Sequence, residues 1–314
     1  MLGRTAGGIY WMFRNLERSE NTARLIEAGL RIALTRSADA ADEWESVVTT
    51  AGQRDAYMEK HDIFDQATAV DFLLRDEDNP SSVRAVIDSA RNNGRQVRTA
   101  LTREVWEATN TCWMTLRDAL DQPVNARDLP TVLGLIRQES AFVRGALHGT
   151  MMRNDIYDFA RLGTFVERSD NTARIVDVKY YVLLPSAFHV GSWLDNVQWE
   201  TILRSVSAQR AYRWQHPGEV SPASIAAFLI LDRRMPRSLA FCYRKIRANL
   251  GYLAGEYDAT HSCHGPADDL LEYVDTRTID SIFDEGLHEF LDRCIARTNE
   301  LGRRIEADYR FNES

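Results

Sequence analysis

The chain contains one eight-residue segment twice, and this duplication constrains the fold more than any other feature. Residues 17–24 read ERSENTAR and residues 167–174 read ERSDNTAR, which is seven identities in eight at an offset of 150 residues. The remaining difference is Glu20 against Asp170. Because self-similarity at a fixed offset is the signature of a repeated structural unit, we expect two copies of one helical unit.

Further matches extend the repeat along the chain in the same order. They are Trp44 with Trp199 and His61 with His216 at an offset of 155, and Pro80 with Pro236 and Ser82 with Ser238 at an offset of 156. A few inserted loop residues explain the drift in offset. We predict a first unit over residues 1–150 and a second over 151–314. No Pro/Gly/Ser-rich linker separates them, so we expect one fused domain with a pseudo-twofold axis.

The pattern of apolar residues predicts an all-α fold. Apolar residues recur at spacings of three and four over residues 9–34, 81–119, 131–149, 156–183, 223–257 and 278–309. Most of the eight prolines fall between these segments, where a proline begins or ends a helix, and alternating strand patterns are absent. The prediction is a duplicated multi-helix bundle, and 314 residues supply enough material for a hydrophobic core.

Composition narrows the expected partners and the compartment. The formal net charge of −8 disfavours broad binding to nucleic acid or to anionic lipid. No apolar run approaches the ~20 residues that a membrane-spanning helix needs, and the first residues do not resemble a signal peptide. The four cysteines form no CxxC pair, which suits reduced thiols. We expect a cytoplasmic protein with no nucleic-acid and no membrane partner.

The repeated segment places charged side chains within an apolar helical surface. On a helical wheel Arg14, Glu17, Asn21 and Arg24 share one arc, with apolar residues above and below them. The matching residues of the second copy are Glu167, Asn171 and Arg174. A charge buried alone costs several kcal/mol, so these groups need partners.

Three kinds of partner are open. Arg24 can pair with Glu20 at i,i+4 spacing, and Glu17 can pair with Arg14 three residues before it. The glutamates and arginines of the two copies can also pair across the pseudo-axis. Such a lattice either fixes helix register alone or lines a polar cavity for a small anionic or amide-bearing ligand, with a glutamate as general base.

Weaker signals add further candidates. Asp76 and Asp232 precede prolines, where an acidic residue caps a helix or lies near a helix N-terminus. Trp106, Glu107 and Asn110 share one helical stretch without a clear mate in the second copy, which suggests a one-sided site. His261, Cys263 and His264 match no zinc spacing, so we predict no metal.

The candidate residues fall into two groups. The candidate catalytic residues are Glu17 and Glu167. The candidate ligand-binding residues are Arg14, Arg18, Asn21, Arg24, Arg168, Asn171, Arg174, Asp76, Trp106, Glu107 and Asn110.

These residues carry a resemblance to the alpha-E family, bacterial all-helical proteins named for a Glu-Arg motif. The resembling segments are Arg4, Tyr10-Trp11, Arg14, Leu16-Glu17-Arg18, Asn21 and Ala23-Arg24, then Asp76 with Asn79-Pro80-Ser81-Ser82 and Arg84, then Trp106-Glu107 with Asn110, Leu162-Gly163, Val166-Glu167-Arg168 and Pro236-Arg237-Ser238. Essentially the whole chain is covered. One departure is Thr164, where the pattern usually has Arg, so the second site is expected to be the weaker.

The resemblance implies a setting more than a reaction. Proteins of this family accompany, or are fused to, a circularly permuted ATP-grasp ligase, often with a transglutaminase-like peptidase and a proteasome-related peptidase. The chain itself has no nucleotide or hydrolase fingerprint such as GxxxxGK[ST], GxGxxG, HExxH or GxSxG. The resemblance therefore implies no cofactor of its own, with ATP and Mg²⁺ bound by the partner ligase.

Three hypotheses follow. The first is an accessory component of an ATP-grasp-dependent system that forms peptide or amide bonds, in which the duplicated Glu-Arg sites bind the ligase, its peptide or amino-acid substrate or an activated intermediate. The second is a stand-alone acyl or aminoacyl transferase with Glu17 or Glu167 as general base. The third is a helical scaffold whose Glu-Arg pairs only hold it together.

Overall fold

The computed structural model describes residues 1–33, 40–183, 193–218 and 220–312. Within these ranges the backbone forms α-helices and one short 3₁₀ turn, and it forms no strand. The predicted all-α fold is therefore confirmed.

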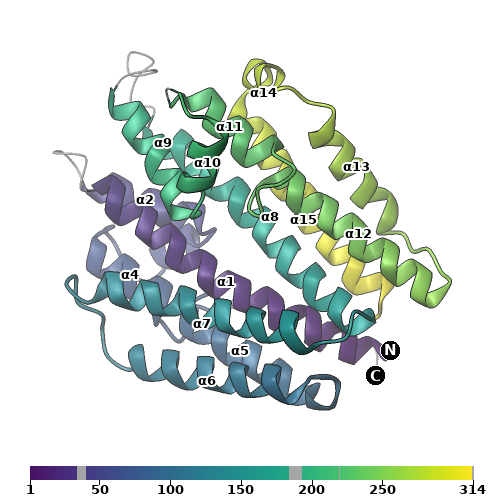
Figure 1. The fold of residues 1–314 in the computed structure, drawn as a ribbon. Coiled ribbons are helices and arrows are strands. Elements are labelled where there is room, and N and C mark those ends of the chain that lie inside the picture. Colours follow the sequence, from purple (N-terminus) through teal and green to yellow (C-terminus); the bar gives the residue numbers. More distant parts are fainter. Residues whose placement is uncertain (34–39, 184–192, 219, 313–314) are drawn as a thin grey trace.

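The helices of the two halves follow one another in a similar order (Figure 1). The first half contains α1 (Gly3–Ala33), α2 (Ala40–Thr50), α3 (Arg54–Met58), α4 (Gln66–Leu74), α5 (Val83–Gln96), the 3₁₀ turn η1 (Arg98–Ala100), α6 (Arg103–Ala119) and α7 (Leu129–Thr150). The second half contains α8 (Asp155–Leu183), α9 (Trp193–Ser205), α10 (Gln209–Gln215), α11 (Pro222–Leu231), α12 (Leu239–Tyr257), α13 (His264–Asp275), α14 (Ile279–Glu285) and α15 (Leu287–Asp308).

Several local features recur in both halves at the offsets seen in the sequence. The side chains of Ser82 and Ser238 cap the N-termini of α5 and α12 by accepting a backbone N–H three residues on. Gly52 and Ser207, 155 residues apart, both have left-handed backbones, with φ of 72° and 56°. The boundary near residue 150 falls in the short link between α7 and α8. The two-unit division and the pseudo-twofold axis stay predictions.

The helices α1 and α8 form the centre of the molecule. Figure 1 shows them running side by side, with α5, α6 and α7 on one side and α12, α13 and α15 on the other. Because neighbours surround α1, its apolar residues cannot be confined to one stripe. Ile9, Met12, Phe13, Leu16 and Ile26 are all buried. Polar side chains in the middle of this helix, among them Glu17, Glu20 and Asn21, are buried as well, so each needs a partner in the protein.

The α1–α8 crossing is close enough to exclude a side chain at one point. A Cβ atom added to Gly163 of α8 would lie 2.2 Å from the carbonyl oxygen of Tyr10 on α1. That neighbour is backbone and cannot rotate away. The close approach brings the two Glu-Arg segments within reach of each other, about two turns beyond Tyr10 on α1 and one turn beyond Gly163 on α8.

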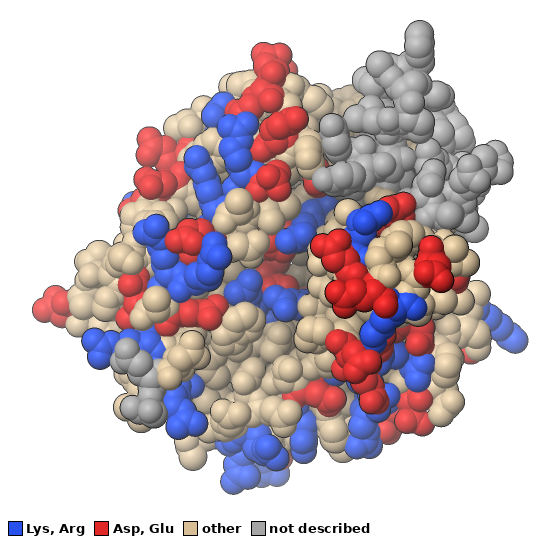
Figure 2. All heavy atoms as spheres, turned by 180° about the vertical axis from the view of Figure 1, so that it is seen from behind, with Lys and Arg blue, Asp and Glu red and all other residues tan. Residues whose placement is uncertain are grey.

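The face of the molecule opposite to the one in Figure 1 carries charges of both signs. Figure 2 shows Lys and Arg side chains intermixed with Asp and Glu over the face seen from behind. Within the described ranges, none of the helices combines the length and the apolarity needed to cross a membrane.

The crossing generates a stability prediction. We expect Gly163→Ala to lower the free energy of unfolding by about 1–3 kcal/mol or more, because the added methyl group overlaps backbone. Gly145→Ala on α7 is the matched control, since a Cβ there meets no atom within 4 Å, and it should gain about 0.5–1 kcal/mol of helix propensity. Urea unfolding of the two variants measures both changes. Equal stability of the two variants would contradict the close crossing.

Candidate functional site

The two Glu-Arg motifs exchange partners across the α1–α8 crossing. Nε and Nη2 of Arg168 donate to the two carboxylate oxygens of Glu17, each at 2.8 Å. In return, Nε and Nη2 of Arg18 donate to the two oxygens of Glu167, at 2.6 and 2.9 Å. Each pair is a bidentate fork, the strongest arginine–carboxylate geometry. The pairing across the two copies that the sequence left open is therefore present.

Helix geometry explains why the motif pairs outward. Consecutive residues on a helix point about 100° apart, so Glu17 cannot reach Arg18 on its own helix. The opposite helix supplies the nearest opposite charge at the crossing. Each motif thus provides both an acceptor and a donor for the other.

The Glu17 centre is filled by further arginines. Nη1 of Arg237, from the loop before α12, lies 3.1 Å from Oε1 of Glu17, and Nη1 of Arg144 on α7 lies 3.3 Å from Oε2. Both arginines also pair with Glu20, which accepts Nε of Arg24 at 3.0 Å as well. Glu17 is 1% exposed. This centre is sealed.

The Glu167 centre is more open. Besides Arg18, it receives Nε of Arg14 at 2.8 Å. Glu167 and both arginines line a cavity of about 210 Å³ between α1, α8 and the loop after α2. The other polar lining residues are Asn21, Thr22, Thr50, Gln53, Ser81, Asp170, Asn171, Arg174 and Asn299.

Both glutamates are held ionised. Burial by itself would raise the pKa of Glu17, but the charges of Arg168, Arg237 and Arg144 outweigh burial and hold the pKa well below its usual value. Burial would likewise raise the pKa of Glu167, but the charges and hydrogen bonds of Arg18 and Arg14 outweigh burial and lower this pKa to about 2. A carboxylate with so low a pKa, bound by two or more guanidinium groups, is a weak general base at neutral pH. The arrangement suits binding and positioning better than proton abstraction.

Comparison with known families agrees with this geometry. The description of the Alpha-E family is a predicted alpha-helical domain with a conserved ER motif, and its model matches residues 1–309. The chain belongs to the Alpha-E family.

Relatives of this Alpha-E chain include uncharacterized proteins of Mycobacterium bovis and Mycobacterium tuberculosis. Each is 24% identical over 271 residues, an alignment that covers 80% of this chain and 30% of the relative. The chain therefore spans about 30% of the length of the curated relatives it matches. No solved structure matches the chain.

The structure settles the pairing within α1. Arg24 binds Glu20, as i,i+4 spacing predicts. The predicted pairing of Arg14 with Glu17 is wrong, because Arg14 turns toward α8 and binds Glu167, while Nη1 of Arg14 donates to the hydroxyl of Tyr10 at 3.3 Å.

The two centres of this Alpha-E chain are unequal in a way that sequence did not anticipate. Thr164 stands where the first copy has Arg14, and its hydroxyl donates to the carbonyl of Ala160 within α8. The Glu167 centre nevertheless keeps the accessible cavity, because its arginines come from α1.

The remaining predicted site residues lie elsewhere. Asp76 binds Nζ of Lys60 at 2.8 and 2.9 Å and accepts the backbone N–H of Asp78, so it organises a turn. On α6, exposed Glu107 pairs with Arg103. Asn110 of the same helix accepts Nε of Arg91 at 3.0 Å. Neither these residues nor Trp106 line the Glu167 cavity.

Sequence reasoning missed three participants: Arg237, Arg144 and Thr50. Arg237 did belong to the Pro236-Arg237-Ser238 segment that resembles the family, so a signal was present. Arg144 and Thr50 carry no motif, and only tertiary packing brings them to the site.

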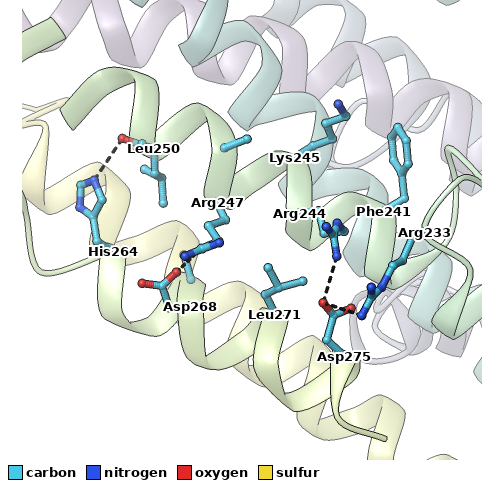
Figure 3. A pocket seen from close by; sticks show the side chains of 13 residues that line it. Arg233, Phe241, Arg244, Lys245, Arg247, Leu250, His264, Asp268, Leu271 and Asp275 are labelled. Atoms are coloured by element: carbon cyan, nitrogen blue, oxygen red, sulfur yellow. Dashed lines mark hydrogen bonds and ion pairs between the residues drawn. The ribbon is translucent and has the colours of Figure 1, made fainter. Parts of the chain in front are cut away.

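A larger groove of about 780 Å³ lies between α12 and α13 (Figure 3). Its charges largely satisfy one another: Asp275 lies 3.2 Å from Arg233 and 3.1 Å from Arg244, and Asp268 pairs with Arg247. His264 contacts the backbone, with Nε2 lying 3.1 Å from the carbonyl of Leu250. Among the described residues no three side chains of the metal-binding types gather at one place.

The sealed centre generates a second stability prediction. Glu17→Gln removes the buried charge that the guanidinium groups of Arg144, Arg168 and Arg237 share, and two of these arginines, Arg168 and Arg237, are themselves buried. We therefore expect a loss of about 3–5 kcal/mol in the free energy of unfolding. The control is Asp268→Asn, which breaks an ion pair that is more than half exposed on both sides and should change stability far less. Chemical denaturation measures both. A loss no larger than that of the control would mean that the lattice stabilises little.

The depressed pKa values also predict a pH dependence. The pKa of Glu167 is about 2 in the folded chain and 4.5 for an ordinary glutamate. Between these two pH values the unfolded chain therefore binds more protons than the folded chain. The ionised Glu167 carboxylate contributes its full stabilisation above pH 4.5, and this stabilisation is lost as the pH falls toward 2. We expect Glu167→Gln to flatten this acid-side loss in urea unfolding at several pH values, whereas exposed Glu107→Gln keeps the wild-type slope. Parallel curves for all three proteins would refute the prediction.

Proposed function

We propose that this Alpha-E chain is an accessory component of an ATP-grasp-dependent system that forms peptide or amide bonds, and that it holds the peptide or amino-acid substrate, or an activated form of it, beside Glu167. In this proposal a circularly permuted ATP-grasp ligase binds ATP and Mg²⁺. Transglutaminase-like and proteasome-related peptidases are proposed members of the same system.

One observation carries the binding role. Two residues that line the Glu167 cavity, Asn171 and Thr50, each have a buried side-chain oxygen, Oδ1 and Oγ1, without a hydrogen-bond partner within the protein. Leaving a buried polar atom unpaired costs about 1–3 kcal/mol, so such atoms in a cavity favour a ligand that supplies the missing donors. The neighbouring arginines can at the same time bind a carboxylate or a carbonyl oxygen.

The size of the cavity supports the division of labour. About 210 Å³ is below the ~300–1,000 Å³ typical of pockets for drug-sized ligands. An amino acid or the end of a peptide fits that space better than a nucleotide with its phosphates.

The lengths of the mycobacterial relatives also support an accessory role. They match this chain over only 30% of their own length, so in them the matching segment lies beside further chain.

A scaffold role is the second candidate, and the Glu17 centre favours it. There each carboxylate oxygen of Glu17 and Glu20 lies within ion-pair distance of a guanidinium group. The two roles are compatible, with a sealed centre that fixes the crossing and an open one that binds. The transferase hypothesis lacks comparable support, because neither glutamate is a free base.

Reconstitution tests the proposal. We expect new amide products, detected by mass spectrometry with the ATP-grasp ligase, ATP and Mg²⁺, to depend on this chain. Asn171→Ala should cut product yield at least tenfold while keeping the fold, since its side-chain oxygen bonds to nothing in the protein.

Asp268→Asn, remote from the cavity, is the matched control and should keep full yield. If products form equally well without the chain, the accessory role is wrong. If the chain is needed but Asn171→Ala has no effect, the cavity is not where the substrate binds.

A further inference from the structure

The two Glu-Arg centres differ at one equivalent position. Ser81 and Arg237 lie 156 residues apart, and each directly precedes the serine that caps a helix, Ser82 for α5 and Ser238 for α12. Arg237 reaches into the Glu17 centre. Ser81 lines the Glu167 cavity. One centre thus contains a guanidinium group where the other contains a short hydroxyl side chain.

Arg237 binds three acceptors on α1. Its Nη1 lies 3.1 Å from Oε1 of Glu17 and donates to Oδ1 of Asn21 at 3.2 Å, and its Nη2 donates to Glu20. These contacts fill the centre, with Arg237 only 7% exposed. The guanidinium group of Arg237 therefore occupies, from within the chain, the position at which a bound cation would contact the first motif.

The equivalent acceptors on α8 are Glu167, Asp170 and Asn171, at an offset of 150. All three line the cavity together with Ser81. Oδ1 of Asn171, the counterpart of the atom that Arg237 binds in the other centre, is the buried oxygen without a partner. The unpaired atom, the short residue and the empty volume coincide.

We infer that the cavity beside Glu167 receives a guanidinium group, such as the arginine side chain of a substrate peptide. The inference rests on the proposed function and adds the chemical class of the ligand. The bound group would occupy the place that Arg237 occupies in the other centre, donating to Asn171 and to the carboxylates of Glu167 and Asp170.

Charge counts agree with this assignment. At the sealed centre four arginines face two acids; they are Arg24, Arg144, Arg168 and Arg237 against Glu17 and Glu20. The open centre has one arginine fewer and one acid more. Arg14, Arg18 and Arg174 lie there against Glu167, Asp170 and Glu306, the last of which is 3.8 Å from Arg14. The open centre therefore contains less positive charge than the sealed one, which favours a bound guanidinium group there.

A second difference widens the open centre. Ser207 supplies a hydroxyl that accepts Nη1 of Arg24 at 2.9 Å. Its counterpart at an offset of 155 is Gly52, which has no side chain and lines the cavity. Gly52 is exposed, and a Cβ atom added to it would lie 3.4 Å from Nη1 of Arg174.

Calorimetry with N-acetyl-arginine amide, whose only charge is the guanidinium group, tests the inference. N-acetyl-citrulline amide, its neutral isostere, and N-acetyl-lysine amide are the comparison probes. We expect the arginine compound to bind at least tenfold more tightly than either. Equal binding of the citrulline compound, or no binding of the arginine compound, overturns the inference.

Two variants locate the binding. Asn171→Ala should weaken binding of the arginine compound at least tenfold at unchanged Tm. Ser81→Arg should abolish binding by filling the cavity from within. Gly149→Arg on α7, where an added Cβ meets no atom within 4 Å, controls for the extra charge and should bind normally. Binding that survives in both Asn171→Ala and Ser81→Arg overturns the assignment to this cavity.

The two proposals can fail separately. If citrulline and arginine compounds bind equally and Asn171→Ala abolishes both, the cavity remains a substrate site and only the guanidinium assignment falls. If the arginine compound binds as expected but the yield of amide product in the reconstituted system does not depend on this chain, the proposed function is wrong and the guanidinium site is still supported.

Discussion

The reciprocal exchange between two Glu-Arg motifs is the interaction on which the rest of this structure depends. Each glutamate on one central helix needs an arginine of the other, because burial makes an unpaired carboxylate prohibitively costly. That need sets the register of α1 against α8. Gly163 permits the necessary approach of the two backbones, and the outer helices then pack around a crossing that has one satisfactory geometry.

The sequence predicted the helical class, the duplication of the Glu-Arg segment and the residues at the centre, because helical periodicity and self-similarity are local properties. It did not predict that Arg14 serves Glu167, since that choice depends on the crossing angle. Nor did it predict the roles of Arg144 and Arg237. Arg144 lies 127 residues from Glu17 in the sequence, and Arg237 lies 216 residues from Asn21. The cavity could not be predicted for a different reason. It depends on small residues, Ser81 and Gly52, at positions where the other half of the chain has the larger Arg237 and Ser207.

The two centres differ in structure although their motifs are nearly identical in sequence. The sealed centre contains all its donors and acceptors within the chain. The open centre has the equivalent acceptors but has Ser81 at the position of Arg237, and Oδ1 of Asn171 has no partner within the protein. The difference comes from one side chain outside the motif, so a motif search alone does not reveal it.

The distance in sequence between the two motifs also matters while the chain is being made. Glu17 and Arg18 leave the ribosome about 150 residues before the arginine and glutamate that neutralise them. At roughly 5–20 residues per second, this interval lasts on the order of ten seconds or more. During that time α1, which has apolar residues on several sides, lacks the packing against α8 that the second half of the chain supplies.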